Sequence, residues 1–168
     1  MRRKLFVVAS LVLAVAATAE EPRVALPADY KETFVEYLSL DRIMNPDQFI
    51  RLFANETASR GPKTNGELEN GSVLVAEVYS VQKNEAGQVK TSKLGRRIPK
   101  ELLLIAVMEK QESFGIGPAS TIDIGNWDMA AYLPSWEVAT KNLDACRACH
   151  ARLTQRDFVF SIEHLRSP

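Results

Sequence analysis

The sequence predicts a single α+β domain, rich in β-structure, in which an antiparallel sheet packs against helices. Residues 72–81 form a valine-rich apolar run directly after the turn signal Asn70-Gly71, which is typical of a buried strand. A turn over 84–87 and a weaker strand over 88–94 would complete a hairpin with it. Upstream of this run, aromatic residues recur at helical spacing instead.

The N-terminus has the pattern of a secretory signal peptide over residues 1–19. Three basic residues precede an apolar run over 5–17 that is short for a membrane span, and Ala17-Thr18-Ala19 supplies the small residues of a cleavage site. We therefore expect an exported mature domain over residues 20–168, with no membrane association after cleavage. An uncleaved membrane anchor is the alternative.

Size and charge limit the possibilities for the mature chain. Its 149 residues are enough for one compact domain and too few for two ordinary ones. Loss of the three N-terminal basic residues leaves 18 basic against 21 acidic residues, a formal net charge of −3. This balance gives no basis for general nucleic-acid affinity.

Two helices are predicted in the N-terminal part. The first covers residues 28–43, with Asp29 as N-cap and aromatic residues on its apolar face. The second begins at Asn45-Pro46, where a capping side chain precedes a proline at the first helical position. Its buried face consists of Phe49, Ile50, Leu52 and Phe53.

The C-terminal part is predicted to mix strands with one helix. Residues 102–108 and 127–133 are β or buried segments. A helix capped by Ser135 is expected to run through the cysteines, and residues 157–160 look extended.

The sequence Cys146-Arg147-Ala148-Cys149-His150 is a CxxCH motif, the attachment pattern of c-type haem. On a helix these positions are i, i+3 and i+4, so both thiols and the imidazole emerge on one face. We predict haem c bound covalently to Cys146 and Cys149, with its iron held by His150. Alternative interpretations are a disulfide, a redox dithiol and half of a zinc site, although zinc needs four ligands and the only further His is His164, with no third Cys in the sequence.

The position of the motif excludes an ordinary helical cytochrome c. In such electron carriers CxxCH lies close to the N-terminus and a methionine ligand follows well downstream. Here only 18 residues follow His150, and none of them is Met. Residues of the preceding sheet must therefore cover the haem.

The mature chain resembles the cytochrome P-460 and cytochrome c′-beta family. The resemblance rests on an ordered set of features: the early Tyr-rich helix ending in Leu40-Asp41-Arg42, then Asn45-Pro46, Gly71-Ser72-Val73-Leu74-Val75, Gly125-Asn126-Trp127, Tyr132-Leu133-Pro134, and CxxCH followed by Asp157-Phe158-Val159-Phe160. It implies a five-stranded antiparallel sheet, a proximal His, an open sixth iron position and a homodimer.

The sequence departs from the catalytic branch of this family at two positions. That branch has a lysine joined to the porphyrin and a distal carboxylate that assists hydroxylamine oxidation. The natural alignment places Ala76 at the lysine and a position near Ile105 at the acid. Lys83, Lys90 or Lys93 is an alternative crosslinking residue. The pocket otherwise resembles the gas-binding cytochrome c′-beta branch.

A distal wall is predicted from the two-residue period of the strands. Its candidates are Leu74, Ala76 and Val78 on one strand and Leu103, Ile105 and Val107 on the next; for each, plain sheet core is the alternative. Phe34, Phe49 and Phe53 are further candidates, as caps of the iron or as simple core. His164, Met44, Met108 and Met129 are the alternative sixth ligands.

Taken together, the residues and the resemblance predict a periplasmic, five-coordinate haem c protein that binds nitric oxide or a related small ligand. The main alternative is a hydroxylamine or nitric oxide oxidase that passes electrons to a cytochrome partner. A third possibility is a six-coordinate electron-transfer cytochrome. Residues 83–100 carry six basic side chains against one acid, which fits either a docking surface for a redox partner or a solvated hairpin.

Overall fold

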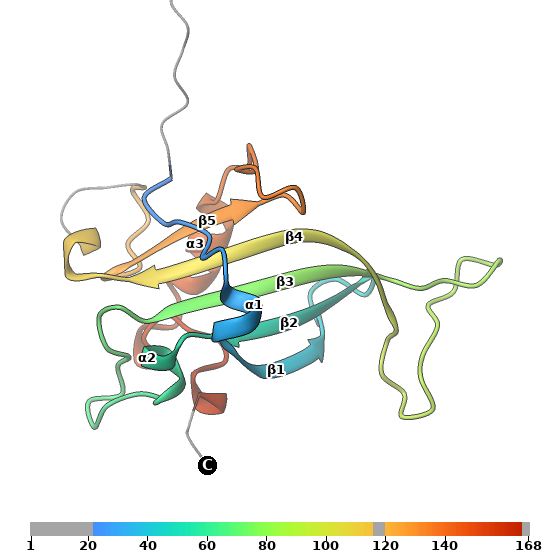
Figure 1. Cartoon of the computed structure of the whole chain (residues 1–168), viewed down its shortest axis with the longest axis horizontal. Helices are drawn as coiled ribbons and strands as arrows, with labels where there is room; N and C mark the ends of the chain where they lie inside the picture. The colour runs from blue at the N-terminus through green and yellow to red at the C-terminus, as the bar shows by residue number, and fades with distance from the viewer. Residues whose placement is uncertain (1–21, 116–119, 166–168) are drawn as a thin grey trace, which may run out of the picture.

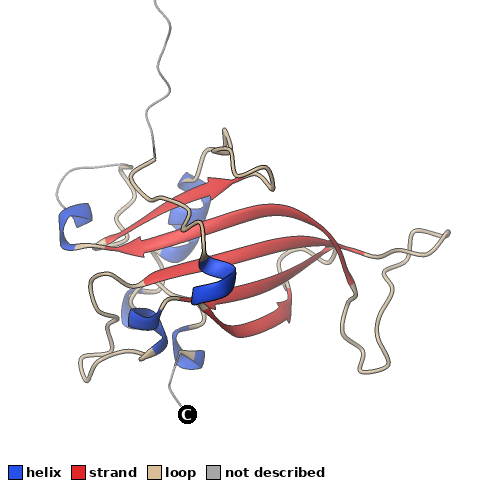
Figure 2. Ribbon diagram, viewed as in Figure 1, coloured by secondary structure: helices blue, strands red, loops and turns tan. Residues whose placement is uncertain are grey.

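A five-stranded antiparallel sheet forms the body of the protein (Figures 1 and 2). The structure, a computed structural model, describes residues 22–115 and 120–165. The strands lie side by side in chain order and are β1 (Val35–Asp41), β2 (Gln48–Ala54), β3 (Val73–Val81), β4 (Pro99–Lys110) and β5 (Trp127–Tyr132). This arrangement confirms the predicted α+β class and its antiparallel sheet.

The helices are short. They are α1 (Tyr30–Thr33), α2 (Glu56–Ser59) and α3 (Asp144–His150), with 3₁₀ segments η1 (Glu112–Gly115), η2 (Thr154–Arg156) and η3 (Ile162–His164). Helices of this length are not stable alone, so contacts with the sheet must hold them in place. Among the described residues, no helix is long and apolar enough to cross a membrane.

The predicted helix over 28–43 is wrong beyond its first turn. Only α1 is helical, and β1 follows at once. Asp29 makes no side-chain cap to α1. The segment Val35–Asp41 contains β-branched and aromatic residues, which suit a strand, and its pairing with β2 outweighs the helical spacing of the aromatic side chains.

The predicted second helix is also wrong over its apolar face, because Phe49, Ile50, Leu52 and Phe53 lie in β2 and only α2 near its end is helical. Asn45 does not cap a helix; its side chain accepts a hydrogen bond from the N–H of Asp47 at 3.0 Å and closes a turn. β2 lies between β1 and β3 and carries apolar side chains on both faces. A strand of this kind lacks two-residue alternation and is easily taken for a helix.

The strands β3, β4 and β5 confirm the strands predicted over 72–81, 102–108 and 127–133. The weaker strand over 88–94 contributes only isolated bridges, at Val89 and Thr91. The helix expected from Ser135 begins only at Asp144, and residues 157–160 form turns rather than a strand.

The two faces of the sheet carry separate apolar clusters, and strand register assigns each residue to one of them. The α3 face carries Leu74, Ala76 and Val78 of β3, and Cys146 of α3 packs against its cluster. The α1 face carries Val75, Glu77 and Tyr79, and Tyr30 of α1 belongs to its cluster. Figure 1 shows α1 in front of the sheet and α3 behind it.

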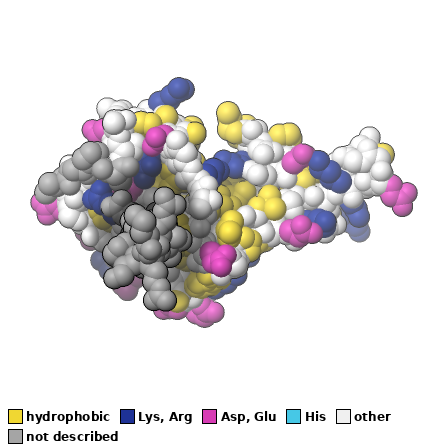
Figure 3. Space-filling view, turned by 90° about the horizontal axis from the view of Figure 1, so that it is seen from above, with side chains coloured by type: hydrophobic (Ala, Val, Ile, Leu, Met, Phe, Trp, Pro, Cys, Tyr) yellow, Lys and Arg dark blue, Asp and Glu magenta, His cyan; other side chains and the backbone are white. Residues whose placement is uncertain are grey.

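Residues 82–98 connect β3 to β4 as a long loop with two tight turns, which we call the excursion, and project from the sheet (Figure 1). Three of its basic residues have structural roles: Lys83 pairs with Asp47, Arg96 with Asp41, and Arg97 donates to three backbone carbonyls of residues 42–48. Figure 3 shows that its surface is charged, whereas apolar side chains gather over the body. These contacts tie the excursion to the β1–β2 turn, which favours a structural origin for much of its basic character.

Replacing Ile105, which is fully buried in the α1-face cluster, by Ala should lower the free energy of unfolding by about 2–5 kcal/mol, because a cavity replaces its side chain. Urea unfolding of the haem-loaded protein measures this loss. Leu103→Ala on the same strand is the control, since Leu103 is 42% exposed and should cost far less. Equal losses in the two variants would contradict the assigned burial of Ile105.

Candidate haem site

The CxxCH residues occupy one turn of α3. Cys146 and Cys149 are free thiols, the first half-buried against the α3-face cluster and the second exposed. With His150 they occupy helical positions i, i+3 and i+4, as the motif predicted. The three side chains therefore lie on one side of α3, and Cys146 packs against the apolar face of the sheet.

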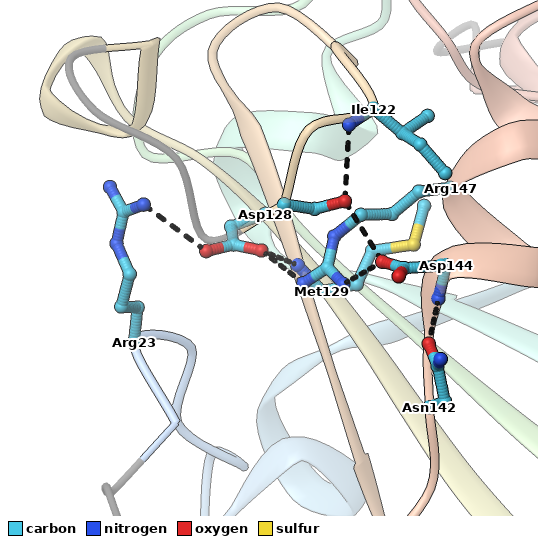
Figure 4. A network of polar contacts seen from close by, with 8 residues as sticks. Arg23, Ile122, Asp128, Met129, Asn142, Asp144 and Arg147 are labelled. Carbon is cyan, nitrogen blue, oxygen red and sulfur yellow. Dashed lines mark hydrogen bonds and ion pairs between the residues drawn. The ribbon is translucent and has the colours of Figure 1, made fainter.

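An ion-pair network holds α3 against the edge strand β5 (Figure 4). Arg147, which is buried, contacts Asp128 of β5 at 2.9 Å and Asp144 at 3.5 Å. Asp128 also pairs with Arg23 of the N-terminal segment at 3.6 Å, and Asp144 accepts a hydrogen bond from Ser120 at 2.8 Å. The network fixes a helix of seven residues that would not be stable alone.

The imidazole of His150 is oriented by two contacts with the segment that follows α3. Its Nδ1 lies 2.7 Å from the carbonyl oxygen of Phe158, to which a protonated Nδ1 donates. The Phe160 ring meets the imidazole edge to face, with centroids 5.0 Å apart. Burial lowers the pKa of His150, and the hydrogen bond to Phe158 opposes this effect only in part. The neutral ring with a proton on Nδ1 keeps the lone pair of Nε2 available for a metal.

A row of small side chains crosses the α3 face of the sheet. Ala76 of β3 pairs with Ala106 of β4, which in turn pairs with Ala131 of β5. The rows on either side and the neighbouring positions of β2 are apolar throughout; they consist of Ile50, Leu52, Ala54, Leu74, Val78, Leu104, Met108 and Met129. Several of these side chains, Ala76, Leu104 and Ala106 among them, are only half-buried. The surface beside α3 is therefore apolar and partly exposed.

The structure brings only part of the predicted distal wall together. Leu74 and Ala76 lie on the α3 face, as does Val78. Ile105 and Val107 lie on the α1 face, where they oppose Glu77 and Val75, so the expectation that Ile105 shares a wall with Ala76 is wrong. The residues of β4 that do face α3 are Leu104, Ala106 and Met108.

The three candidate phenylalanines also lie away from α3. Phe34 and Phe53 belong to the α1-face cluster, and Phe49 opposes Tyr79 on that face. Sequence reasoning missed Phe158 and Phe160, which contact His150 through a backbone carbonyl and a ring. The only sequence signal for them was their place just after the CxxCH motif.

The other residues weighed as haem ligands or crosslinks are spread over the molecule. His164 lies in η3 with a half-exposed side chain beside Glu163, and Met44 is exposed in the β1–β2 turn. Met108 and Met129 oppose each other on the α3 face and contribute to its cluster. Lys83, Lys90 and Lys93 stand on the excursion, away from Ala76.

The described residues fit a haem c. Its attachment needs two thiols one helical turn apart, its iron needs an imidazole nitrogen, and its macrocycle needs an apolar surface. Cys146, Cys149 and Nε2 of His150 supply the first two, and the row of small apolar side chains on the α3 face is an apolar surface of the kind that the macrocycle needs.

Comparison with known proteins agrees with this chemistry. A sequence model of the family described as cytochrome P460 matches residues 27–161, which is most of the chain and includes every strand, α3 and the CxxCH motif. Comparison with curated proteins gave no match. The match confirms the resemblance inferred from the sequence. The chain belongs to the cytochrome P460 family, whose members are c-type haem proteins.

Proposed function

We propose that this protein binds nitric oxide or a related small ligand at a five-coordinate haem c, in the manner of the cytochrome c′-beta branch. Cys146 and Cys149 form the thioether links in this proposal, and His150 is the proximal ligand. The observation that carries the proposal is the apolar composition of the α3 face around Ala76, Ala106 and Leu104. A haem with one imidazole and an open sixth position supplies an iron that binds diatomic gases.

The chain's own residues would set the selectivity. Apolar side chains such as Leu104 and Val78 offer no hydrogen bond to a polarised dioxygen, whereas nitric oxide needs none to bind ferrous iron tightly. Selectivity of this kind depends on the polarity and crowding of the distal side. The α3 face therefore favours binding of nitric oxide over binding and activation of dioxygen.

The alternative, an oxidase of hydroxylamine or nitric oxide, would need a lysine and a carboxylate near the haem. Ala76 stands where the lysine is expected, and its neighbour Glu77 points to the α1 face, where it accepts hydrogen bonds from Tyr30 and Tyr79. β4 supplies no acid to the α3 face between Leu102 and Met108. These placements favour the gas-binding function.

Absorption spectra of the haem-loaded protein test the proposal, taken in the ferric state, in the ferrous state, and in the ferrous state with nitric oxide. We expect an ordinary high-spin ferrous c-haem spectrum that shifts on addition of nitric oxide. A ferrous Soret band displaced strongly to the red would instead indicate a lysine crosslink and the oxidase. A low-spin spectrum with slow ligand binding would indicate a six-coordinate electron carrier.

Leu104→Ala should change the rate of carbon monoxide or nitric oxide binding several-fold, because it alters crowding on the α3 face. Leu102→Ala should leave the rate unchanged. Both are half-buried leucines of β4, but a bulge between them places Leu102 against the α1-face cluster. Flash photolysis of the ferrous carbon monoxide complex measures both. A larger effect from Leu102→Ala would indicate that the ligand binds on the α1 face, and would contradict the proposed site on the α3 face.

We also propose export through residues 1–19, which lie outside the described residues, and a periplasmic location typical of the family. A homodimer completes the proposal, whereas transfer of electrons to a cytochrome partner belongs to the alternative oxidase. Sedimentation of the haem-loaded protein tests the dimer, and mass determination of protein from the periplasm tests cleavage near Glu20.

A further inference from the structure

The chain adopts a strained conformation directly after α3 and η2. Asp157 and Phe158 both have left-handed backbone angles, with φ of 46° and 60°. Such angles are disfavoured for residues with a Cβ, and cost on the order of 1–3 kcal/mol each unless surrounding contacts impose them. Contacts around Asp157 and Phe158 must therefore impose these backbone angles.

Buried polar contacts of Asp157 are the first of these contacts. Both carboxylate oxygens lie 2.8 Å from Nζ of Lys110 at the end of β4, and Oδ2 also accepts the backbone N–H of Leu68 at 2.8 Å. Lys110 and Asp157 are 5% and 6% exposed, so solvent screens this pair little. The pair anchors the left-handed turn to the sheet.

A second contact fixes the turn from its other side. The Phe158 ring lies against Gly125, where a Cβ would come within 2.7 Å of ring atom Cε2. Gly125 has φ of 63°, so both its backbone and the space above it require glycine. Gly125 thus holds the ring of Phe158 in one position, and the backbone carbonyl oxygen of Phe158 contacts Nδ1 of His150.

We propose that the buried Lys110–Asp157 pair is a positioning device for the proximal iron ligand. It holds the strained turn that aims the Phe158 carbonyl at His150, and so fixes the tautomer, orientation and donor strength of the imidazole. This inference rests on the proposed ligation of iron by His150. Lys110 and Asp157 act through the turn and touch neither the iron nor the gaseous ligand.

A contribution to folding stability does not by itself explain why a buried Lys110–Asp157 ion pair occurs here. Desolvation of two buried charges offsets much of their attraction, and apolar replacements of such pairs are often neutral or stabilising. A contact to the imidazole Nδ1–H, by contrast, raises the basicity of a metal-bound histidine and tunes the metal. A rigid acceptor at this position therefore has a functional use that an apolar pair would lack.

Lys110→Met tests the proposal in the haem-loaded ferrous protein, with resonance Raman spectroscopy of the iron–histidine stretch and with the reduction potential as readouts. Loss of the held carbonyl should weaken the donor, so the stretch should move to lower wavenumber and the potential should rise. Lys110→Arg should move both values back toward wild type. Glu77→Gln is the control, since Glu77 is a fully buried carboxylate on the opposite face, and it should change neither value.

Gly125→Ala is a second, independent variant that displaces the Phe158 ring without altering the ion pair, and it should shift the stretch in the same direction. It keeps the test decisive if Lys110→Met does not fold. Folded Lys110→Met or Gly125→Ala protein with an unchanged stretch and potential would overturn the positioning role alone. Absence of an iron–histidine band in wild type, or its persistence in His150→Ala, would overturn the ligation by His150 and the positioning role with it.

Discussion

Replacing both cysteines by serine should make the haem extractable into acidic organic solvent, whereas wild-type haem should stay with the polypeptide. Serine cannot form the thioether links proposed for Cys146 and Cys149, so only the iron–imidazole bond and apolar contacts would remain. Acid protonates the imidazole and releases the metal. The expected change is from essentially no extraction to nearly complete extraction.

Matched variants separate attachment from folding. Ala148→Ser changes an exposed residue between the two cysteines and should leave the haem unextractable. The single variants Cys146→Ser and Cys149→Ser should each keep one link and show an altered spectrum of the reduced pyridine complex, which reports the number of remaining vinyl groups. Haem that stays bound after both cysteines are replaced would exclude thioether attachment at this helix.

The CxxCH turn was predictable from the sequence because its geometry is local. Cys146, Cys149 and His150 lie within one helical turn, so their mutual placement depends only on the helical period. The strand β3 was equally evident, since its apolar run follows directly on a turn signal. In both cases the signal lies within the element or directly before it, so no contact between distant residues was needed to predict it.

The two N-terminal strands were not predictable in this way. The strand β2 lies between β1 and β3 and has apolar residues on both of its faces. It therefore lacks the alternation of apolar and polar residues that marks a strand. Pairing of β2 with β3, at positions 20 to 32 residues apart, decides its conformation. Only the tertiary structure contains that information.

The face assignment failed for a related reason. Residues 102–108 are all apolar, so hydrophobicity cannot say whether Ile105 or Ala106 lies on the α3 face of the sheet. The answer depends on register and on the bulge between Leu102 and Leu104. The acceptor for His150 was beyond prediction altogether, because it is a backbone carbonyl aimed by left-handed residues.

Replacing His150 by Ala should abolish the spectrum of imidazole-bound haem while the covalent haem content stays unchanged. Nε2 of His150 is the donor that the structure leaves for iron, since Nδ1 contacts the Phe158 carbonyl at 2.7 Å. The ferrous iron–histidine stretch should disappear, and exogenous imidazole should restore part of the spectrum by occupying the emptied position. Unchanged Soret and nitric oxide spectra in this variant would remove His150 from the iron.

The matched control is His164→Ala, because His164 is the second of the two histidines in the sequence. Its side chain is half-exposed in η3 beside Glu163, so its loss should leave the ferric, ferrous and nitric oxide spectra as they are in wild type. A change from low spin to high spin in His164→Ala would instead identify it as a sixth ligand and favour the electron-transfer function. The two histidine variants together therefore test which imidazole binds the iron and whether the opposite side is open to a gas.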